Sequence, residues 1–174
     1  MKPRKKAAKN SKKSKDRVAI HHPIQMPIQV SAARKNDMRS QFGALVYRVK
    51  NDKIQILLIT SRTRGRWIIP KGWPMIGETP ADAAATEAWE EAGVKGKVYD
   101  RCLGLYSYTK RREDQRDLPC LVMIYPIKAK KLSDKFPEAG QRRRKWFSRK
   151  KAAKLVSEPE LAKMIASFDP RHVK

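Results

Sequence analysis

Alternating apolar and polar residues predict a β-hairpin near the start of the folded part of the chain. Residues 40–50 alternate in this way, and a second β-rich run covers residues 54–60. Asn51 and Asp52 lie between the two runs, and both residue types favour tight turns. A short apolar segment, residues 67–69, predicts a further strand that leads into a glycine-containing loop.

A helix is predicted over residues 80–92, between a start signal and a stop signal. The Thr79 side chain can cap the first turn, Pro80 suits the first helical position, and Gly93 suits the end. Small side chains on one face would let the helix axis lie close to a sheet, and that face holds Ala81, Ala84, Ala85, Ala88 and Ala92. We therefore expect the helix to be buried on alanine and open on its acidic face.

Three glutamates share that acidic face. Glu87, Glu90 and Glu91 have the spacing i, i+3, i+4, which places them within an arc of about 100°. Like charges at this spacing destabilise a helix by roughly 0.2–0.5 kcal/mol per pair, and the helix has no Lys or Arg to offset them. A hard divalent cation such as Mg²⁺ would balance converging carboxylates. A solvated acidic face is the simpler alternative.

The rest of the pattern predicts an α/β domain. Residues 98–109 and 118–127 are expected to form two strands joined by a highly charged connection, and residues 144–148 one more. Helical patterns cover residues 149–156 and 158–168. Strands on both sides of the glutamate helix and helices at the end of the chain predict a mixed sheet between helical layers.

Basic residues dominate the composition, with 41 Lys and Arg against 17 Asp and Glu, a formal net charge of +24. Such a charge attracts phosphate-rich partners, but it does not choose among nucleic acid, nucleotide, inositol polyphosphate and an anionic membrane. We expect residues 1–37 to form a basic, flexible N-terminal extension and residues 38–174 to form the folded domain. The extension could contact RNA or DNA through phosphates, act as a localisation signal, or be a solvated tail.

No apolar run approaches the length that spans a bilayer, and the N-terminus lacks the apolar core of a secretory signal. We therefore expect no membrane partner and a cytoplasmic location. Cys102 and Cys120 are the only cysteines, and they have neither the spacing of a zinc site nor that of a disulfide framework. Both are expected to be buried free thiols.

A longer motif connects the loop to the glutamate helix. Gly72 is followed after five residues by Glu78, and after seven more by TEAWEEAGV. This arrangement resembles the Nudix box, G-x5-E-x7-R-E-U-x-E-E-x-G-U, where U is aliphatic. The one departure is Thr86, where the family has an Arg that commonly orients the first-loop glutamate. The resemblance implies a Nudix hydrolase with an α/β/α sandwich and a mixed sheet, using Mg²⁺ or Mn²⁺ to cleave a phosphoanhydride.

Roles for the residues of this motif follow from the resemblance. Glu87 and Glu91 are the expected metal ligands, and the backbone carbonyl of Lys71 is a further candidate. Glu90 is the expected general base, and Glu78 is expected to assist it or to join the metal shell. In such enzymes the metal neutralises charge on the diphosphate, and a carboxylate helps to activate water.

Similarity to one subfamily, the diphosphoinositol polyphosphate phosphohydrolases, extends over residues 39–168. It is carried by SRTRGRWIIPKGWPM, EEAGVKGKV and RRKWFSRKKAAKLV, although the chain has Lys71-Gly72-Trp73 where that subfamily usually has three glycines. Forked guanidinium groups suit the binding of several phosphates. The similarity implies that six residues bind substrate phosphate: Arg39, Ser61, Arg62, Gly72, Arg116 and Arg143.

Two classes of function remain open at this point. The first is a hydrolase that acts on a polyphosphorylated small molecule, either diphosphoinositol polyphosphate or dinucleoside polyphosphate, with removal of diphosphate from the 5′ end of RNA as a variant. The second is a non-catalytic RNA-binding module on the same scaffold, which the strong positive charge and Thr86 would suit. The presence together of Glu78, Glu87, Glu90 and Glu91 favours the enzyme.

Overall fold

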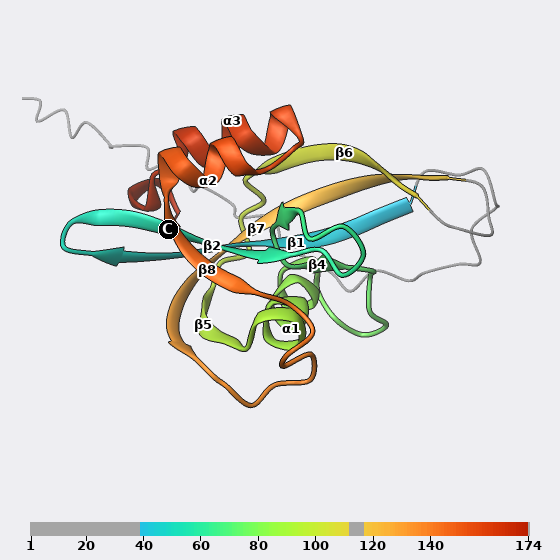
Figure 1. Ribbon diagram of the computed structural model, residues 1–174, viewed down its shortest axis with the longest axis horizontal. Helices are drawn as coiled ribbons and strands as arrows, with labels where there is room; N and C mark the ends of the chain where they lie inside the picture. The colour runs from blue at the N-terminus through green and yellow to red at the C-terminus, as the bar shows by residue number, and fades with distance from the viewer. Residues whose placement is uncertain (1–38, 112–116, 174) are drawn as a thin grey trace, which may run out of the picture.

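Eight strands form one mixed sheet in this computed structural model, which describes residues 39–111 and 117–173 (Figure 1). The main path runs β3-β2-β1-β7-β5, with β4 paired to β1, β6 to β7 and β8 to β2. β1 and β7 are parallel, and the other pairs are antiparallel. The strands are β1 Arg39–Lys50, β2 Lys53–Thr60, β3 Trp67–Ile68, β4 Lys71–Gly72, β5 Val94–Val98, β6 Gly104–Lys110, β7 Leu118–Leu132 and β8 Arg144–Ser148.

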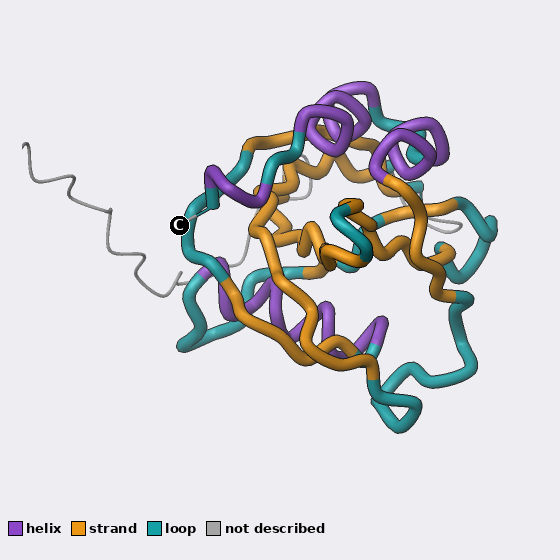
Figure 2. The backbone as a smooth tube through the Cα atoms, turned by 90° about the vertical axis from the view of Figure 1, so that its left-hand side faces the viewer, coloured by secondary structure: helices purple, strands orange, loops and turns teal. Residues whose placement is uncertain are grey.

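Helices cover both faces of the sheet. α1, Pro80–Ala92, packs on one face, while α2, Arg149–Leu155, and α3, Pro159–Ser167, pack on the other (Figures 1 and 2). A 3₁₀ turn, η1, covers Pro170–His172. The predicted α/β/α sandwich with a mixed sheet is confirmed.

Strand β1 shows how one strand serves both layers. Phe42 and Val46 pack toward the alanine face of α1, whereas Leu45 and Tyr47 pack toward α2 and α3. Successive side chains of a strand point to opposite faces, so a central strand covered on both sides is apolar almost throughout. Even-numbered residues in the buried part of β1 therefore point toward α1, and odd-numbered residues point toward α2 and α3.

The local signals in the sequence produce the elements that they predict. Asn51 and Asp52 have φ of 49° and 57°, the left-handed turn conformation that connects β1 to β2. The Thr79 hydroxyl accepts a hydrogen bond from the Asp82 N–H at 3.2 Å, which caps α1. Gly93 ends that helix with φ of 66°.

Other boundaries differ from the predictions. The strand expected over residues 98–109 corresponds to β6, which begins only at Gly104, and a separate strand, β5, ends at Val98 before it. β5 was missed because Lys95, Gly96 and Lys97 interrupt its apolar pattern, and exposed lysines are common on a strand at the edge of a sheet. β7 continues five residues beyond the predicted end at 127. Cys120 is buried, but Cys102 is exposed, so the prediction of two buried thiols is wrong for Cys102.

Two sequence predictions fall on parts of the chain that are not described. The expected N-terminal extension, residues 1–37, and the predicted phosphate ligand Arg116 both lie outside the described residues. Within residues 39–111 and 117–173, every helix falls short of the length and apolarity that crossing a bilayer requires.

Substitution of Gly93 by Ala should destabilise the fold more than the same change at Gly65. Both glycines have positive φ, 66° and 62°, so each substitution costs about 1 kcal/mol in backbone strain. A Cβ at Gly93 would also lie 2.6 Å from the Ser133 carbonyl oxygen, whereas nothing lies within 4 Å at Gly65. We expect about 1–3 kcal/mol of further loss for Gly93→Ala, measured by urea unfolding. Equal losses for the two variants would contradict this packing.

Candidate active site

The box loop and the glutamate helix meet where β4 crosses beneath α1. Gly72 pairs with Phe42 of β1, which places it on the α1 side of the sheet. A Cβ built on Gly72 would lie 1.7 Å from Oε1 of Glu87. Glycine is therefore required here by the Glu87 carboxylate itself, which is a reason for Gly72 separate from the predicted phosphate contact.

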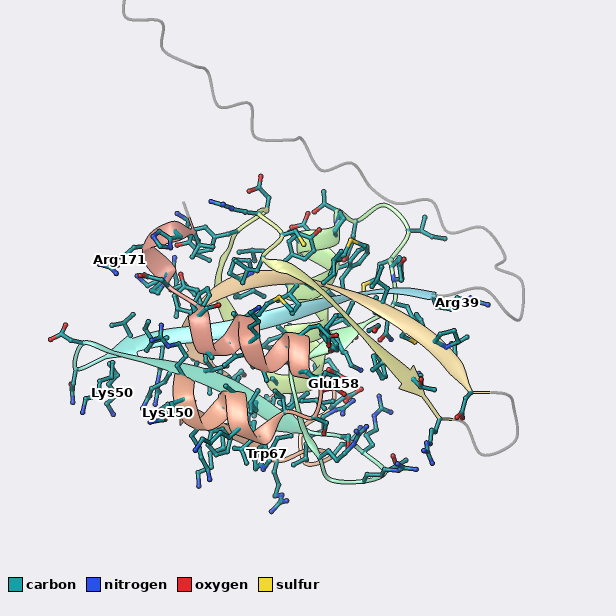
Figure 3. All side chains as sticks on the ribbon, turned by 90° about the horizontal axis from the view of Figure 1, so that it is seen from above. Arg39, Lys50, Trp67, Lys150, Glu158 and Arg171 are labelled. Atoms are coloured by element: carbon teal, nitrogen blue, oxygen red, sulfur yellow. The ribbon has the colours of Figure 1, made fainter. Side chains whose placement is uncertain are left out.

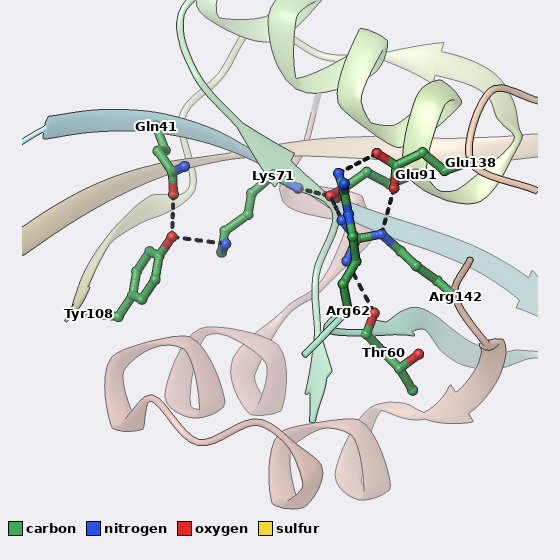
Figure 4. A network of polar contacts seen from close by, with 8 residues as sticks. All are labelled: Gln41, Thr60, Arg62, Lys71, Glu91, Tyr108, Glu138 and Arg142. Carbon is green, nitrogen blue, oxygen red and sulfur yellow. Dashed lines mark hydrogen bonds and ion pairs between the residues drawn. The ribbon is translucent and has the colours of Figure 1, made fainter. Parts of the chain in front are cut away.

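Glu91 is buried at this junction, with 6% of its surface exposed. Its Oε2 accepts a hydrogen bond from the Lys71 backbone N–H at 2.9 Å, and its Oε1 forms an ion pair with Nη2 of Arg142 (Figure 4). Burial raises the pKa of Glu91, while the Arg142 charge and the Lys71 N–H act in the opposite direction. The prediction that α1 is open on its glutamate face is thus wrong for Glu91, because an internal cation covers that side chain.

Arg142 ties the same junction to the loop before β8. Only 7% of its side chain is exposed, and its Nε donates to Oε2 of Glu138 at 2.8 Å while its Nη1 donates to the Thr60 carbonyl at 3.2 Å. Glu138 also accepts a hydrogen bond from Arg62 at 2.6 Å (Figure 4). One guanidinium therefore joins α1, the end of β2 and the loop before β8.

Sequence reasoning missed Arg142 and chose its neighbour Arg143. Arg144 also points inward, since its Nη1 donates to the carbonyls of Ala92 and Ser133, whereas the Arg143 guanidinium lies over the Trp67 ring at 5.7 Å. The alternation of Arg142, Arg143 and Arg144 between the two directions follows the period of an extended chain. Extending the alternation of the predicted strand at residues 144–148 back to residue 142 could have identified Arg142 as a residue that points the same way as Arg144.

Glu87 and its acidic neighbours carry negative charge that Arg142 does not neutralise. Burial, together with the charges of Glu91, Glu90 and Glu138, raises the pKa of Glu87 to about 7. Within the described residues, no three His, Cys, Asp or Glu side chains are arranged to hold a metal ion. The expected convergence of three glutamates is therefore not observed, because Glu91 faces Arg142.

The donor chemistry of this cluster nevertheless fits a hard divalent cation. Such ions prefer carboxylate and carbonyl oxygens, and the cluster offers the carboxylates of Glu87 and Glu91 beside the backbone of Lys71. A divalent charge would also offset the repulsion that raises the pKa of Glu87. The residues present therefore suit the metal that the box implies.

Thr86 contacts Glu78 despite its departure from the box. Its hydroxyl donates to Oε2 of Glu78 at 3.2 Å, and Oε1 lies at 3.4 Å. The Glu78 backbone N–H also donates to the Met75 carbonyl at 3.3 Å, which closes a turn in the loop. A neutral hydroxyl thus links the first-loop glutamate to α1 at the position where the box has Arg.

The structure brings together three of the six predicted phosphate-binding residues. Ser61, Arg62 and Arg143 lie at the end of β2 and before β8, and Arg62 pairs with Glu138. Ser61 Oγ accepts a hydrogen bond from the Arg66 N–H at 3.0 Å, so it also closes the loop between β2 and β3. Arg39 starts β1 and lies apart from Trp67, the ring that the Arg143 guanidinium covers (Figure 3).

Replacing Arg142 by Met should destabilise the protein by about 3–5 kcal/mol, because the buried Glu91 carboxylate would lose its cation. Arg143→Met is the matched control, since Arg143 is exposed, and we expect it to cost less than about 1 kcal/mol. Urea unfolding of both variants measures the difference. Adding Glu91→Gln to Arg142→Met should recover part of the loss; a larger loss in the double variant would argue against the pair.

Replacing Glu87 by Gln should stabilise the metal-free protein above neutral pH. The folded-state pKa of about 7 exceeds the ordinary 4.5, so the folded state holds more protons between these values and stability falls as pH rises through that window. We expect Glu87→Gln to be more stable than the parent by about 1–3 kcal/mol at pH 8 and equal to it near pH 4. Unfolding in EDTA at several pH values tests this, with the exposed Glu160→Gln as control. A pH-independent difference would be inconsistent with it.

Comparison with known proteins agrees with the box. A family model of the NUDIX domain matches residues 39–168. Nudix hydrolase 13, mitochondrial, of Arabidopsis thaliana is 30% identical over 150 residues, covering 76% of this chain and 74% of that protein. Human diphosphoinositol polyphosphate phosphohydrolase 3-alpha is 29% identical over 132 residues, covering 75% and 76%. Among such relatives, the share of their length that this chain spans runs from 59% to 76%.

A solved structure supports the fold. The crystal structure of C. elegans Ap4A hydrolase superposes with a TM-score of 0.54 at 20% identity, covering 75% of this chain and 95% of that chain. The domain match, the sandwich and the glutamates of α1 agree with one another. The chain therefore belongs to the Nudix family, as a hydrolase of phosphoanhydrides.

Proposed function

We propose that this chain is a Mg²⁺-dependent pyrophosphohydrolase that cleaves a phosphoanhydride in a polyphosphorylated small molecule, either diphosphoinositol polyphosphate or dinucleoside polyphosphate. The observation that carries the proposal is the packing of the Glu87 and Glu91 carboxylates directly against the backbone of β4. Relatives and structural neighbours include a diphosphoinositol polyphosphate phosphohydrolase and an Ap4A hydrolase, which supports both substrate classes.

Glu87 and Glu91 would hold the metal, with the carbonyl of Lys71 as a further ligand. When bound, Mg²⁺ supplies charge neutralisation of the diphosphate and polarisation of the phosphorus centre. Glu91 is held by Arg142 and by the Lys71 N–H, so its carboxylate is fixed relative to β4. Fixed carboxylates suit catalysis that depends on positioning and electrostatics.

Glu90 would act as the general base. Its carboxylate takes a proton from water while the water oxygen bonds to phosphorus and the bond from phosphorus to the bridging oxygen breaks. Glu90 lies on α1 between the two metal ligands, and its carbonyl accepts the Glu138 N–H at 3.0 Å. Glu78, held by the Thr86 hydroxyl, would support the metal site directly or through water.

Basic residues around the end of β2 would bind the remaining phosphates. Arg62 is 59% exposed in its side chain, and Arg143 lies beside it in the fold at the end of β2. Arg62 keeps its guanidinium at Glu138 beside the acidic junction, where a substrate phosphate can accept two hydrogen bonds from one fork, whereas the Arg143 guanidinium lies over Trp67. Ser61 would contribute from the end of β2, Gly72 from beside Glu87 on β4, and Arg39 from the start of β1.

Phosphate release with Mg²⁺ tests the proposal directly. The panel should contain a diphosphoinositol polyphosphate, a dinucleoside polyphosphate and a 5′-triphosphorylated RNA, each run with Mg²⁺ and with EDTA. We expect Mg²⁺-dependent turnover of one of the two small-molecule classes, and a fall in kcat of about 10²–10⁴-fold for Glu90→Gln.

Glu160→Gln is the matched control, because Glu160 is an exposed carboxylate on α3 and should leave kcat unchanged. Turnover in EDTA, or full activity of Glu90→Gln, would refute the assigned roles. Exclusive turnover of RNA would move the substrate to the 5′ end of a nucleic acid.

A further inference from the structure

Exposed lysines gather on two paired strands at one edge of the sheet. β5 ends the main path of strands, and no other described strand pairs with its outer edge. Neither β5 nor β7 contains an Asp or a Glu. We call this group of exposed side chains the lysine ribbon, and its members are Lys95, Lys97, Lys128, Lys130 and Lys131.

The register of the two strands sets these lysines opposite one another. Lys95 pairs with Lys131. Lys97 pairs with Lys128, and the register shift between the two pairs leaves Lys130 without a partner on β5. The Cβ atoms of directly opposite residues lie about 4.5–5.5 Å apart, and like charges at such positions destabilise the strand pair. A negatively charged partner would offset that repulsion.

The ribbon has no counter-charge of its own in the part of the chain that the structure describes. None of its lysines forms an ion pair with a carboxylate there. Asp134, three residues beyond Lys131, pairs with Arg144 instead. Asp100, three residues beyond Lys97, forms no ion pair with a described residue. The positive charge of the ribbon is therefore open to a partner in solution.

Aromatic rings hold two lysines of the ribbon in place. Nζ of Lys95 lies 4.6 Å from the centroid of the Trp89 ring, and Nζ of Lys97 lies 4.8 Å from that of Tyr99. A ring face attracts a cation, so both ammonium groups are positioned before a partner binds. Basic side chains beside aromatic rings are typical of surfaces that bind single-stranded nucleic acid, where the backbone meets the cations and bases can stack on the rings.

A membrane fits the ribbon less well than a nucleic acid does. Proteins that lie on an anionic membrane insert large apolar side chains between the lipids in addition to using their charge. The large apolar side chains that are exposed among residues 39–111 and 117–173 all lie outside β5 and β7: Val49, Trp73, Ile76 and Leu105. The ribbon thus offers charge and positioned donors without an apolar anchor.

We propose that the lysine ribbon binds the phosphate backbone of single-stranded RNA. Alternate residues of a strand lie about 7 Å apart, so the ribbon presents a row of ammonium groups to a chain of phosphates. The outer edge of β5 also offers backbone N–H and C=O groups, and the 2′-hydroxyl of RNA can both donate to and accept from such groups. This surface shares no residue with the candidate active site, so the inference goes beyond the proposed function and does not depend on it.

The salt dependence of RNA binding tests the ribbon. Fluorescence anisotropy of labelled oligo(U) with the full chain, repeated over a range of KCl concentrations, gives the slope of log K against log salt. Each lost contact to a single-stranded phosphate should reduce that slope by about 0.7. We therefore expect a reduction of about 3 for the ribbon variant, which combines Lys95→Gln, Lys97→Gln, Lys128→Gln and Lys131→Gln.

A matched control removes the same charge from other exposed positions on β2, α2 and α3. It combines Lys53→Gln, Lys150→Gln, Lys154→Gln and Lys163→Gln, and its slope should change by less than about 1. Both variants keep residues 1–37, so any contact made by that basic segment is common to them. Equal losses of slope in the two variants would show attraction by net charge alone and would overturn the inference, as would a failure of the parent protein to bind RNA.

Thermal unfolding separates RNA binding from a structural role of these lysines. Removing like charges that face one another should leave the ribbon variant at least as stable as the parent. If the ribbon variant does not fold, the variant with only Lys97→Gln and Lys128→Gln provides the same test, with an expected reduction in slope of about 1.4. A parent-like slope in that variant would refute the ribbon as the binding surface.

Two further probes identify the partner. Oligo(dU) lacks the 2′-hydroxyl and should bind about 2–10-fold more weakly than oligo(U), the value of one hydrogen bond, and equal binding would overturn the assignment to RNA. Ribbon-dependent binding to phosphatidylserine vesicles without binding to oligo(U) would overturn it in favour of a membrane. Phosphate release from the substrate panel should be the same for the ribbon variant and the parent, so the proposed function and this inference can fail separately.

Discussion

Glu91 holds three segments of the chain together through one buried carboxylate. One oxygen accepts the Lys71 N–H of β4, and the other pairs with Arg142 from the segment before β8, while the residue itself belongs to α1. Taking a carboxylate and a guanidinium out of water is costly, and the pair is stable only because each has further partners. α1 cannot shift against the box loop without breaking these contacts, so the relative position of the two is set by charge as well as by packing.

The distribution of charge around β4 gives the two sides of the sheet opposite characters. On the α1 side, Glu87, Glu91 and Glu138 outnumber the cations that contact them, and the raised pKa of Glu87 reflects that excess. On the other side, the Lys71 ammonium donates to the neutral Tyr108 hydroxyl and forms no ion pair within residues 39–111 and 117–173. The first side favours a cation and the second an anion.

Local signals in the sequence made α1 and the first hairpin predictable, whereas contacts between distant residues could not be predicted. The cap at Thr79, the stop at Gly93 and the turn at Asn51-Asp52 act over a few residues, and the structure has each of them. The ion pair of Arg142 joins residues that are 51 positions apart, and its partner depends on how β8 pairs with β2. Alternation along residues 142–144 separates Arg142 from Arg143, but it does not say which of the two faces α1 until that register is known. β5 was not predicted for a different reason: its exposed lysines give this edge strand the polar pattern that is typical of a loop.

Thr86 shows how the departure from the box is accommodated. An Arg at this position would bring both a contact to the first-loop glutamate and a positive charge to a helix with none beside its glutamates. The Thr86 hydroxyl supplies only the contact, at 3.2 Å from Glu78. Arg142 brings a positive charge to the same cluster from the loop before β8, where it neutralises Glu91 instead of Glu78. Because contact and charge come from two residues on different elements, the loop glutamate is held by a weaker neutral hydrogen bond, while the helix glutamate is held by the stronger ionic one.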